Sequence, residues 1–489
     1  MQRLGAFFAR VAQRHLPDPL VLACVLTLVV GAVAWILPYD PALRAAGWGS
    51  RGAQLARIWL GGLWNPAFLT FALQMCVVLL TGFGLARAPV VLRGLRRLAA
   101  WPRSNRGAVA LIAAVSCAGC WINWGFGLVF AGVLALEVRA ALARRGVACQ
   151  FALIVASAYV GMMIWHGGLS GSAPLKVAET GVTIATEAGE PLKVPPVSVG
   201  RTTLSGSNLL LTTVLLVGIP LTLRGLASRT GAADPDADAA ADQETPATRR
   251  NEPKGNAVPQ PGWADRLNRS RALAATIGVL VLVGVGVQVY DAMRTGGASR
   301  ATAALHAVNL NTVNSLFLAL GILLHPHLAS YVAAVTEGGR AIAGIVVQFP
   351  LYSGIQALMF GAGLAVALSN GFVDAAQWVA DACGISSTTT FPLATFASAG
   401  IVNFFVPSGG GQWIVQGPIM CQAAHGLGVS VPQTVMAIAY GDQLTNMVQP
   451  FWAIPLMGLT RVDARAFLGY CALLMLLAAP VMAIGLLLY

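Results

Sequence analysis

Polar, glycine-rich sequence interrupts long apolar runs at four places in this chain of 489 residues: Asn123–Gly127, His166–Pro174, Ser408–Trp413 and Gly441–Pro450. A helix that restarts after such an interruption presents unpaired N–H groups and partial positive charge, which suit a carboxylate. A helix that stops presents carbonyl oxygens, which together with Asn, Ser or Thr oxygens suit a hard cation such as Na⁺. The four interruptions therefore predict a binding site for a small organic anion with a cation nearby.

The candidate substrate- and ion-binding residues lie within or beside these interruptions. They are Asn123, Trp124, Gly125, Gly127, Ser170, Gly171, Ser172, Asn403, Ser408, Gly409, Gly410, Gly411, Gln412, Asp442, Gln443, Thr445 and Asn446. We expect Na⁺ to bind near Asn123, Ser170, Asn403 and Asn446. No catalytic residue and no cofactor other than a coupling Na⁺ or H⁺ is predicted.

Asp442 is the most informative single residue because it interrupts an apolar run. A carboxylate inside a membrane segment costs several kcal/mol unless it is paired or functional. We predict that Asp442 binds Na⁺ or carries a proton, and the alternative is a buried acid satisfied by helix ends. His166 is open to two interpretations, a proton relay or a packed, hydrogen-bonded histidine. The tryptophans near the breaks also have two interpretations: they wall an apolar pocket, or they anchor the protein at the membrane interface. These residues are Trp121, Trp124, Trp413 and Trp452.

The composition identifies the medium that surrounds these residues. The chain is 56% hydrophobic and 10% charged, whereas a soluble protein carries about 25% charged residues. The net charge of +12 comes from arginines in short gaps between apolar runs, a pattern typical of cytoplasmic loops. Because no basic face interleaves with exposed aromatics, a nucleic-acid partner is excluded. The eight cysteines are scattered and are interpreted as small packing residues.

The apolar runs predict nine full spans. They are Pro19–Leu37, Pro66–Ala86, Phe151–Leu175, Asn208–Leu223, Leu273–Met293, Ala304–Leu324, Gly344–Leu368, Val435–Gly458 and Phe467–Leu488. The first is too long for a typical signal peptide and is expected to be retained.

Two further apolar stretches, 107–142 and 392–426, are broken in the middle into halves of about 12 to 15 residues, short for a crossing. Arginines flank the first on both sides, whereas no Lys or Arg occurs from Gly371 through Thr460 around the second. We therefore predict two opposed re-entrant hairpins, with the N-terminus cytoplasmic and the C-terminus periplasmic.

An internal repeat supports this topology. Four short matches recur at an offset of about 280 positions, and Asn123 after Ala118-Gly119 corresponds to Asn403 after Ala399-Gly400. The single span Leu273–Met293 lies between the halves and would turn the second upside down. Inverted repeats with broken helices are typical of secondary transporters. The predicted fold is thus an all-α integral membrane protein of two inverted repeats.

The predicted domain boundaries follow from this repeat. The first transmembrane repeat covers 1–223, a flexible cytoplasmic linker 224–271, a linking helix and loop 272–303, and the second repeat 304–489. The linker is the one long hydrophilic stretch, and it is too polar to bury a core.

The sequence resembles the bacterial short-chain fatty acid transporter family, of the acetoacetate and butyrate uptake type. The resemblance is carried by Leu16–Leu20, Ile122–Leu128, Val406–Trp413 with Gln416–Pro418, Ala437–Gly441 and Gln449–Trp452, and it covers nearly the whole chain except the linker. It implies the ion transporter superfamily, a scaffold plus a transport domain, hairpins that meet at mid-membrane, homodimers, and cation-driven transport of short monocarboxylates. Relatives often carry His where this chain has Gln412, so a proton-carrying role at that position does not transfer.

Other functions are less consistent with the residues. A carrier of dicarboxylates or other organic anions would favour an Arg or Lys within the breaks, and none is present there. A membrane-embedded acyltransferase would gather acid, base or metal-ligating residues near one face, whereas the six histidines are dispersed. We therefore expect a multi-pass protein of the bacterial inner membrane, not an enzyme, whose partners are a small organic anion and membrane lipid.

Overall fold

The computed structural model describes residues 2–184, 192–228, 262–295 and 309–489. Helices dominate these residues, and two three-residue strands, β1 (Val182–Ile184) and β2 (Leu192–Val194), pair antiparallel with Val182 opposite Val194. The predicted all-α membrane fold is confirmed, and the β1–β2 pair is a small element that the sequence analysis missed.

The helices of the first half are α1 (Gln2–His15), α2 (Pro19–Ile36), α3 (Pro41–Ala45), α4 (Trp48–Leu63), α5 (Pro66–Arg87), α6 (Pro89–Ala99), α7 (Asn105–Ile122), α8 (Trp124–Ala143), α9 (Phe151–Tyr159), η1 (Val160–Met163), α10 (Ser172–Thr180), η2 (Val199–Arg201) and α11 (Gly206–Leu226). Those that follow are α13 (Trp263–Asn268), α14 (Arg271–Thr295), α16 (Leu310–Leu324), α17 (Leu328–Gly338), η3 (Gly339–Ile342), α18 (Ala343–Gly361), α19 (Leu364–Cys383), α20 (Ser387–Phe405), α21 (Gly409–Gly426), α22 (Val431–Thr445), η4 (Asn446–Val448), α23 (Pro450–Thr460) and α24 (Ala464–Leu486).

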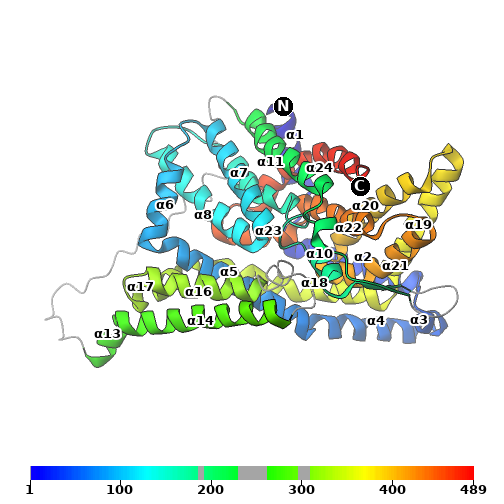
Figure 1. The fold of residues 1–489 in the computed structure, drawn as a ribbon, viewed down its shortest axis with the longest axis horizontal. Helices are drawn as coiled ribbons and strands as arrows, with labels where there is room; N and C mark the ends of the chain where they lie inside the picture. Colours follow the sequence, from blue (N-terminus) through cyan, green and yellow to red (C-terminus); the bar gives the residue numbers. More distant parts are fainter. Residues whose placement is uncertain (1, 185–191, 229–261, 296–308) are drawn as a thin grey trace.

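The helices pack in two groups that are visible in Figure 1. Helices α4, α5, α14, α16 and α18 run side by side along the long axis of the molecule. The other group joins α7, α8, α9 and α11 of the first half to α20, α22 and α24 of the second. Buried apolar side chains fill both groups, including Phe349 in the first and Tyr159 and Phe467 in the second.

Two helical hairpins have the positions that the sequence predicts for re-entrant segments. Helices α7 and α8 meet at Asn123, and α20 and α21 meet at residues 406–408. Asn123 and Ser408 are N-cap residues whose side-chain oxygens accept hydrogen bonds from the N–H groups of Phe126 and Gly411. Capping lets each helix restart at once, so the non-helical backbone is shorter than predicted: Gly125 to Gly127 and Gly409 to Trp413 are helical.

The arms of these hairpins are also longer than the sequence analysis predicted. They measure 18 and 20 residues in the first hairpin and 19 and 18 in the second, not 12 to 15. The polar residues between the arms serve as N-caps and first helical turns, so they lengthen the second arm of each hairpin.

Two helices outside the hairpins are broken. Helix α9 passes into the short 3₁₀ helix η1, and irregular backbone follows until α10 begins at Ser172. Helix α22 passes into η4, and Gln449 is extended before α23 begins at Pro450. The break expected over Gly441–Pro450 is thus confined to residues 446–449, because Gly441 to Thr445 complete α22.

Eight stretches of helix within the described ranges are long and apolar enough to cross a membrane, against nine predicted. Six of them overlap predicted spans, one of these, Trp48–Arg87, being a 40-residue stretch that joins α4 to α5, and two are the arms of the first hairpin. The predicted spans Phe151–Leu175 and Val435–Gly458 are broken helices instead, and Ala304–Leu324 is described only from residue 309.

Helices α4 and α19 were missed as separate elements. Helix α4 contains Arg51 and Arg57, and the guanidinium of Arg51 is buried and donates to the carbonyls of Leu43 and Trp35. Residues 229–261 of the predicted linker and residues 296–303 of the predicted linking segment lie outside the described residues. The domain division remains a prediction.

Candidate functional site

A cavity of about 440 Å³ lies where α8, α10 and α21 begin. Its lining includes five predicted residues: Asn123, Trp124, Ser170, Ser172 and Gly410. The remaining lining residues were not predicted: Phe71, Gln74, Leu175, Lys176, Glu179, Asn309 and Leu310. The structure therefore brings the ends of both hairpins and the first broken helix to one cavity.

Three helix N-termini supply the electrostatics of this cavity, because Trp124, Ser172 and Gly410 each lie in the first turn of their helix. Each helix N-terminus carries about half a positive charge and N–H groups without an intrahelical acceptor. Ser170 Oγ accepts the N–H of Trp124 at 3.2 Å. The N–H groups of Gly125 and Gly410 lie at second helical positions, where the helix itself offers no acceptor. This arrangement suits one carboxylate.

One wall of the cavity is apolar, with Phe71, Trp124, Leu175 and Leu310. The ring of Trp124 is 6.4 Å from that of Phe71 and 5.1 Å from that of Trp452, which stands behind it. Of the four tryptophans considered from the sequence, only Trp124 lines the cavity. A short alkyl chain can contact this wall while its carboxylate meets the helix N-termini.

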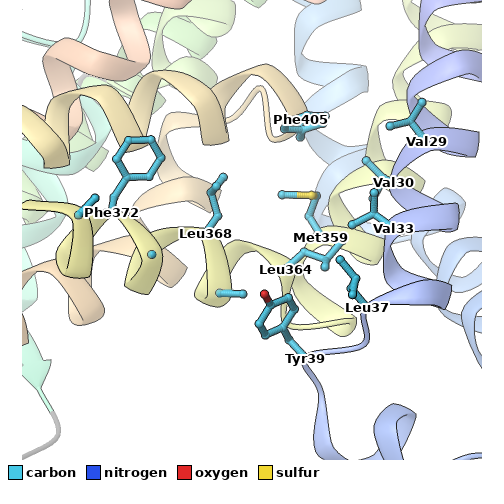
Figure 2. A pocket seen from close by; sticks show the side chains of 13 residues that line it. Val29, Val30, Val33, Leu37, Tyr39, Met359, Leu364, Leu368, Phe372 and Phe405 are labelled. Carbon is cyan, nitrogen blue, oxygen red and sulfur yellow. The ribbon is translucent and has the colours of Figure 1, made fainter. Parts of the chain in front are cut away.

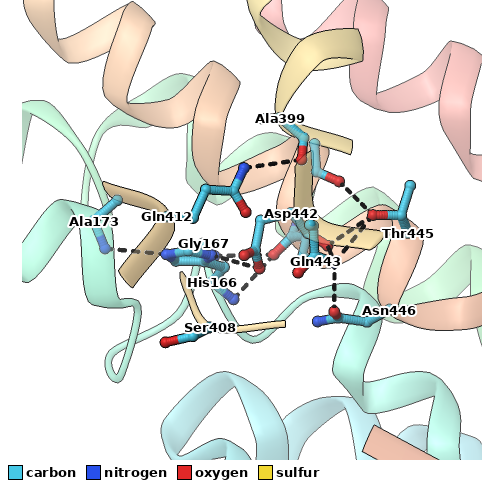
Figure 3. A network of polar contacts seen from close by, with 12 residues as sticks. His166, Gly167, Ala173, Ala399, Ser408, Gln412, Asp442, Gln443, Thr445 and Asn446 are labelled. Atoms are coloured by element: carbon cyan, nitrogen blue, oxygen red, sulfur yellow. Dashed lines mark hydrogen bonds and ion pairs between the residues drawn. The ribbon is translucent and has the colours of Figure 1, made fainter. Parts of the chain in front are cut away.

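His166 and Asp442 form a fully buried pair next to the cavity, although 276 positions separate them (Figure 3). The distance from His166 Nδ1 to Asp442 Oδ1 is 2.9 Å, and the side chains are 0% and 1% exposed. His166 Nε2 accepts the N–H of Ala173 at 3.0 Å. Because Nε2 is an acceptor, the ring proton lies on Nδ1 and is donated to Asp442. Neutral His166 therefore bridges α22 and the first turn of α10.

Two neighbouring side chains strengthen this connection. Gln443 Oε1 accepts the N–H groups of His166 and Gly167, both at 3.0 Å. Asn208 of α11 donates to the carbonyl of Gly167 and accepts from the hydroxyl of Tyr440. We call Asp442, Gln443 and Tyr440, with the residues they hold on the first half, the buried clamp.

Asn403, Thr445 and Asn446 form a second polar cluster, between α20 and the end of α22. Asn403 Nδ2 lies 2.8 Å from Asn446 Oδ1, 2.9 Å from the carbonyl of Asp442 and 3.1 Å from Thr445 Oγ1. Gln449, which the sequence analysis did not select, donates to the carbonyl of Asn403. These residues do not line the cavity, and the carbonyl of Asp442 links them to the clamp.

Several side-chain oxygens near this cluster have no hydrogen-bond partner within the part of the chain described: Asn403 Oδ1, Gln412 Oε1, Asp442 Oδ2 and Gln449 Oε1. Buried polar atoms are nearly always paired, so these are the positions where a cation ligand set is best supplied. Gln412 itself donates to the carbonyl of Ala399 and to Gln416 Oε1. Within the described ranges, no group of three or more His, Cys, Asp or Glu side chains is placed to hold a metal.

The predicted glycines have mainly steric roles. A Cβ on Gly127 would lie 2.2 Å from the Cys120 nitrogen, and one on Gly409 would lie 2.6 Å from the imidazole of His166. On Gly171 it would lie 2.0 Å from the carbonyl oxygen of His166, and on Gly411 it would meet Gln356 at 2.6 Å. Because these four glycines lack a Cβ, their backbone can closely approach neighbouring backbone or side-chain atoms. Gly125 and Gly410, in contrast, have room for a methyl group.

Lys176 and Glu179 are the charged lining residues that sequence reasoning missed. Together with Ser172 and Leu175 they occupy positions i, i+3, i+4 and i+7 of α10, so one helix face points into the cavity. This spacing could have identified them. No Arg or Lys lies within the breaks, as the sequence analysis states, but Lys176 lies just beyond the first broken helix and lines the cavity.

A second cavity, of about 450 Å³, is apolar (Figure 2). It lies between α2, Met359 of α18 and α19, and Phe405 reaches it from the end of α20. Among its lining side chains only Tyr39 carries a polar group. It offers no partner for a charged solute, so the cavity at the three helix N-termini is the candidate site.

The fold and the site together define a multi-pass α-helical membrane protein with a cavity suited to a small anion. The chain belongs to the short-chain fatty acid transporter family, whose model matches residues 1–489. An Escherichia coli K12 relative is 34% identical over 493 residues, covering 100% of this chain and 99% of its own. A Haemophilus influenzae relative is 33% identical over 500 residues, with 99% of both covered. Both are provisionally named short-chain fatty acid transporters.

Solved structures of other transporters are similar only at a low level. The Alcanivorax borkumensis YdaH transporter gives a TM-score of 0.41 at 16% identity, covering 96% of this chain and 97% of that one. Neisseria gonorrhoeae MtrF gives 0.38 at 13% identity, covering 98% and 96%. The family membership therefore rests on sequence.

Proposed function

We propose that the protein is a secondary active transporter that moves short monocarboxylates, such as butyrate or acetoacetate, across the bacterial inner membrane together with a cation. The observation that carries this proposal is the cavity at the starts of α8, α10 and α21. Its helix N-termini are matched to one carboxylate, and its wall of Phe71, Trp124 and Leu310 is matched to a short alkyl chain.

The coupling cation binds beside the cavity rather than in it. Oxygens without partners among the described residues, Asn403 Oδ1 and Asp442 Oδ2, support a site between α20 and α22. The candidate Na⁺ ligands Asn123 and Ser170 belong to the cavity itself. Through His166, Asp442 is connected to Ala173 at the start of α10. A cation that binds Asp442 therefore changes the contacts of a helix that lines the substrate cavity.

The proposal includes a membrane arrangement. The arginines of α6 and the loop after it, such as Arg93 and Arg103, favour a cytoplasmic position for that end of the first hairpin. In the proposed arrangement the N-terminus is cytoplasmic, the C-terminus is periplasmic, and the two repeats are inverted relative to each other. Membrane lipid surrounds the exposed apolar faces of α2 and α14, and the protein forms a homodimer.

Uptake of labelled butyrate and acetoacetate into proteoliposomes, with Na⁺ and pH gradients imposed separately, tests the proposal. We expect accumulation that follows one of the two gradients. Asp442→Asn removes the carboxylate while preserving its shape, and should abolish the dependence on that gradient. Asp374→Asn, which neutralises an exposed acid on α19, is the matched control. Gradient-driven accumulation that is unchanged in Asp442→Asn would show that Asp442 does not couple transport.

Transport of dicarboxylates is the second candidate, and Lys176 is the observation that favours it. Lys176 follows Ser172 by about one turn of α10, a rise of about 6 Å along the helix axis, and both line the cavity. A second carboxylate could meet it there. Competition by succinate against labelled butyrate distinguishes the two candidates.

A further inference from the structure

The charges at the outer part of the cavity are paired with each other. Lys176 Nζ lies 3.3 Å from Glu179 Oε2, and the two side chains are 53% and 49% exposed. Both residues belong to the face of α10 that lines the cavity. Lys176 is the one cationic side chain among the described lining residues, and Glu179 is the one anionic side chain. Their charges cancel.

The deeper part of the cavity has no formal charge. Asn123, Ser170 and Ser172 are neutral, and Gly410 offers a backbone N–H group at the second position of α21. The helix N-termini contribute partial positive charge, which balances one carboxylate. A solute with one negative charge is therefore balanced without Lys176, whereas a solute with two negative charges needs a second cationic partner.

We propose that Glu179 sets the selectivity for monocarboxylates by occupying Lys176 and repelling a second carboxylate at the same place. The inference rests on the proposed function and names the residue that limits its substrate class. Selectivity of this kind arises from a repulsive group directed against the wrong ligand. Glu179 is a specificity-determining residue that does not contact the monocarboxylate.

Neutralising Glu179 frees Lys176 and removes the repulsion. In proteoliposomes containing Glu179→Gln, we expect the succinate concentration that halves butyrate uptake to fall several-fold, up to about tenfold. The change in succinate inhibition should exceed any change in the KM for butyrate, because the amides and hydroxyls that meet the single carboxylate are retained. The gain should weaken as salt is raised, since exposed charges are screened.

A second variant separates Lys176 from a general change in the cavity. The double variant Lys176→Gln with Glu179→Gln lacks the freed cation and should lose the gain in succinate inhibition. Asp463→Asn, which neutralises an acid of similar exposure that pairs with Arg465 outside the cavity, is the matched control. A Glu179→Gln variant with unchanged succinate inhibition, or a gain that survives in the double variant, overturns the inference.

Binding measured without transport keeps the inference separate from the proposed function. The thermal stabilisation of the purified full-length protein by succinate should increase in Glu179→Gln relative to wild type, with stabilisation by butyrate unchanged. If wild type fails to take up butyrate but this shift occurs, the proposed transport fails and the selectivity role stands. If wild type takes up butyrate, but Glu179→Gln changes neither succinate inhibition nor thermal stabilisation by succinate, the selectivity role fails and the proposed transport stands.

Discussion

The buried clamp and the cavity next to it are built from similar polar residues but in opposite ways. In the clamp, His166, Asp442 and Gln443 are at most 2% exposed and are held by hydrogen bonds near 3 Å. In the cavity, Lys176 and Glu179 are half-exposed and hold only each other. A buried carboxylate and its hydrogen-bond donor keep a fixed geometry because neither has an alternative partner in water, whereas an exposed ion pair can exchange partners at little cost. The clamp therefore fixes positions, and the cavity remains free to bind.

The largest expected effect is on the stability of the clamp. His166→Ala leaves the Asp442 carboxylate buried without its partner, and we expect the free energy of unfolding to fall by about 3–5 kcal/mol. Reversible unfolding in mixed micelles measures this loss. His425→Ala, at an exposed position near the end of α21, should change it little. In the double variant His166→Ala with Asp442→Ala, the free energy of unfolding should fall less than in His166→Ala alone. A loss in the double variant equal to the sum of the losses in His166→Ala and Asp442→Ala would mean that the pair is not coupled.

A smaller effect is expected in the cavity, and it should appear in binding. A methyl group at Gly410 would approach Ser172 Cβ to 3.9 Å without a clash. It would therefore narrow the cavity without disturbing the fold. We expect Gly410→Ala to raise the KM for butyrate by about tenfold with stability unchanged. Gly218→Ala on α11, which meets no atom within 4 Å, is the control. A fall in stability without a change in KM would mean that Gly410 has a structural role, like the residues of the buried clamp, and no role in binding.

The smallest expected effect concerns Ser170. Its hydroxyl accepts the N–H of Trp124 and orients the first turn of α8 towards the cavity. Ser170→Ala should weaken butyrate binding by about 1 kcal/mol, roughly fivefold in KM. Thr213→Ala, which removes an exposed hydroxyl that bonds within α11, serves as the comparison in the same uptake assay. An identical KM in both variants would remove Ser170 from the site.

Local sequence was sufficient to locate the breaks in the helices. Asn123 and Ser408 are good N-cap residues followed by glycines, and Pro450 begins a helix after the fourth interruption. The extent of non-helical backbone was overestimated there, because a cap restores helical hydrogen bonding within one residue. His166 to Gly171 stayed irregular as predicted.

The partners of polar residues were beyond local reasoning. Asp442 was singled out correctly as a costly buried acid, but its contact with His166 joins positions 276 apart. Asn208 and Gln449 were not selected, because a single amide in an apolar helix has no distinctive spacing. Lys176 lies outside the polar break itself, and only its helical spacing from Ser172 indicates that it faces the cavity. Pairings between distant segments depend on packing that no short window contains.

The glycines around the end of α7 have a mechanical consequence. A side-chain carbon at Gly127, Gly161 or Gly168 would lie within about 2.5 Å of α7 backbone, and Leu169 also donates to the carbonyl of Trp121 at 2.7 Å. Interfaces packed this closely have low compressibility and transmit strain. The side of the cavity formed by the first hairpin and the first broken helix is therefore rigid. On the opposite side of the cavity, an added methyl group at Gly410 would stand 3.9 Å from Ser172 Cβ, whereas one at Gly409 would lie 2.6 Å from the imidazole of His166, so the second hairpin tolerates added bulk at Gly410 alone of these two positions.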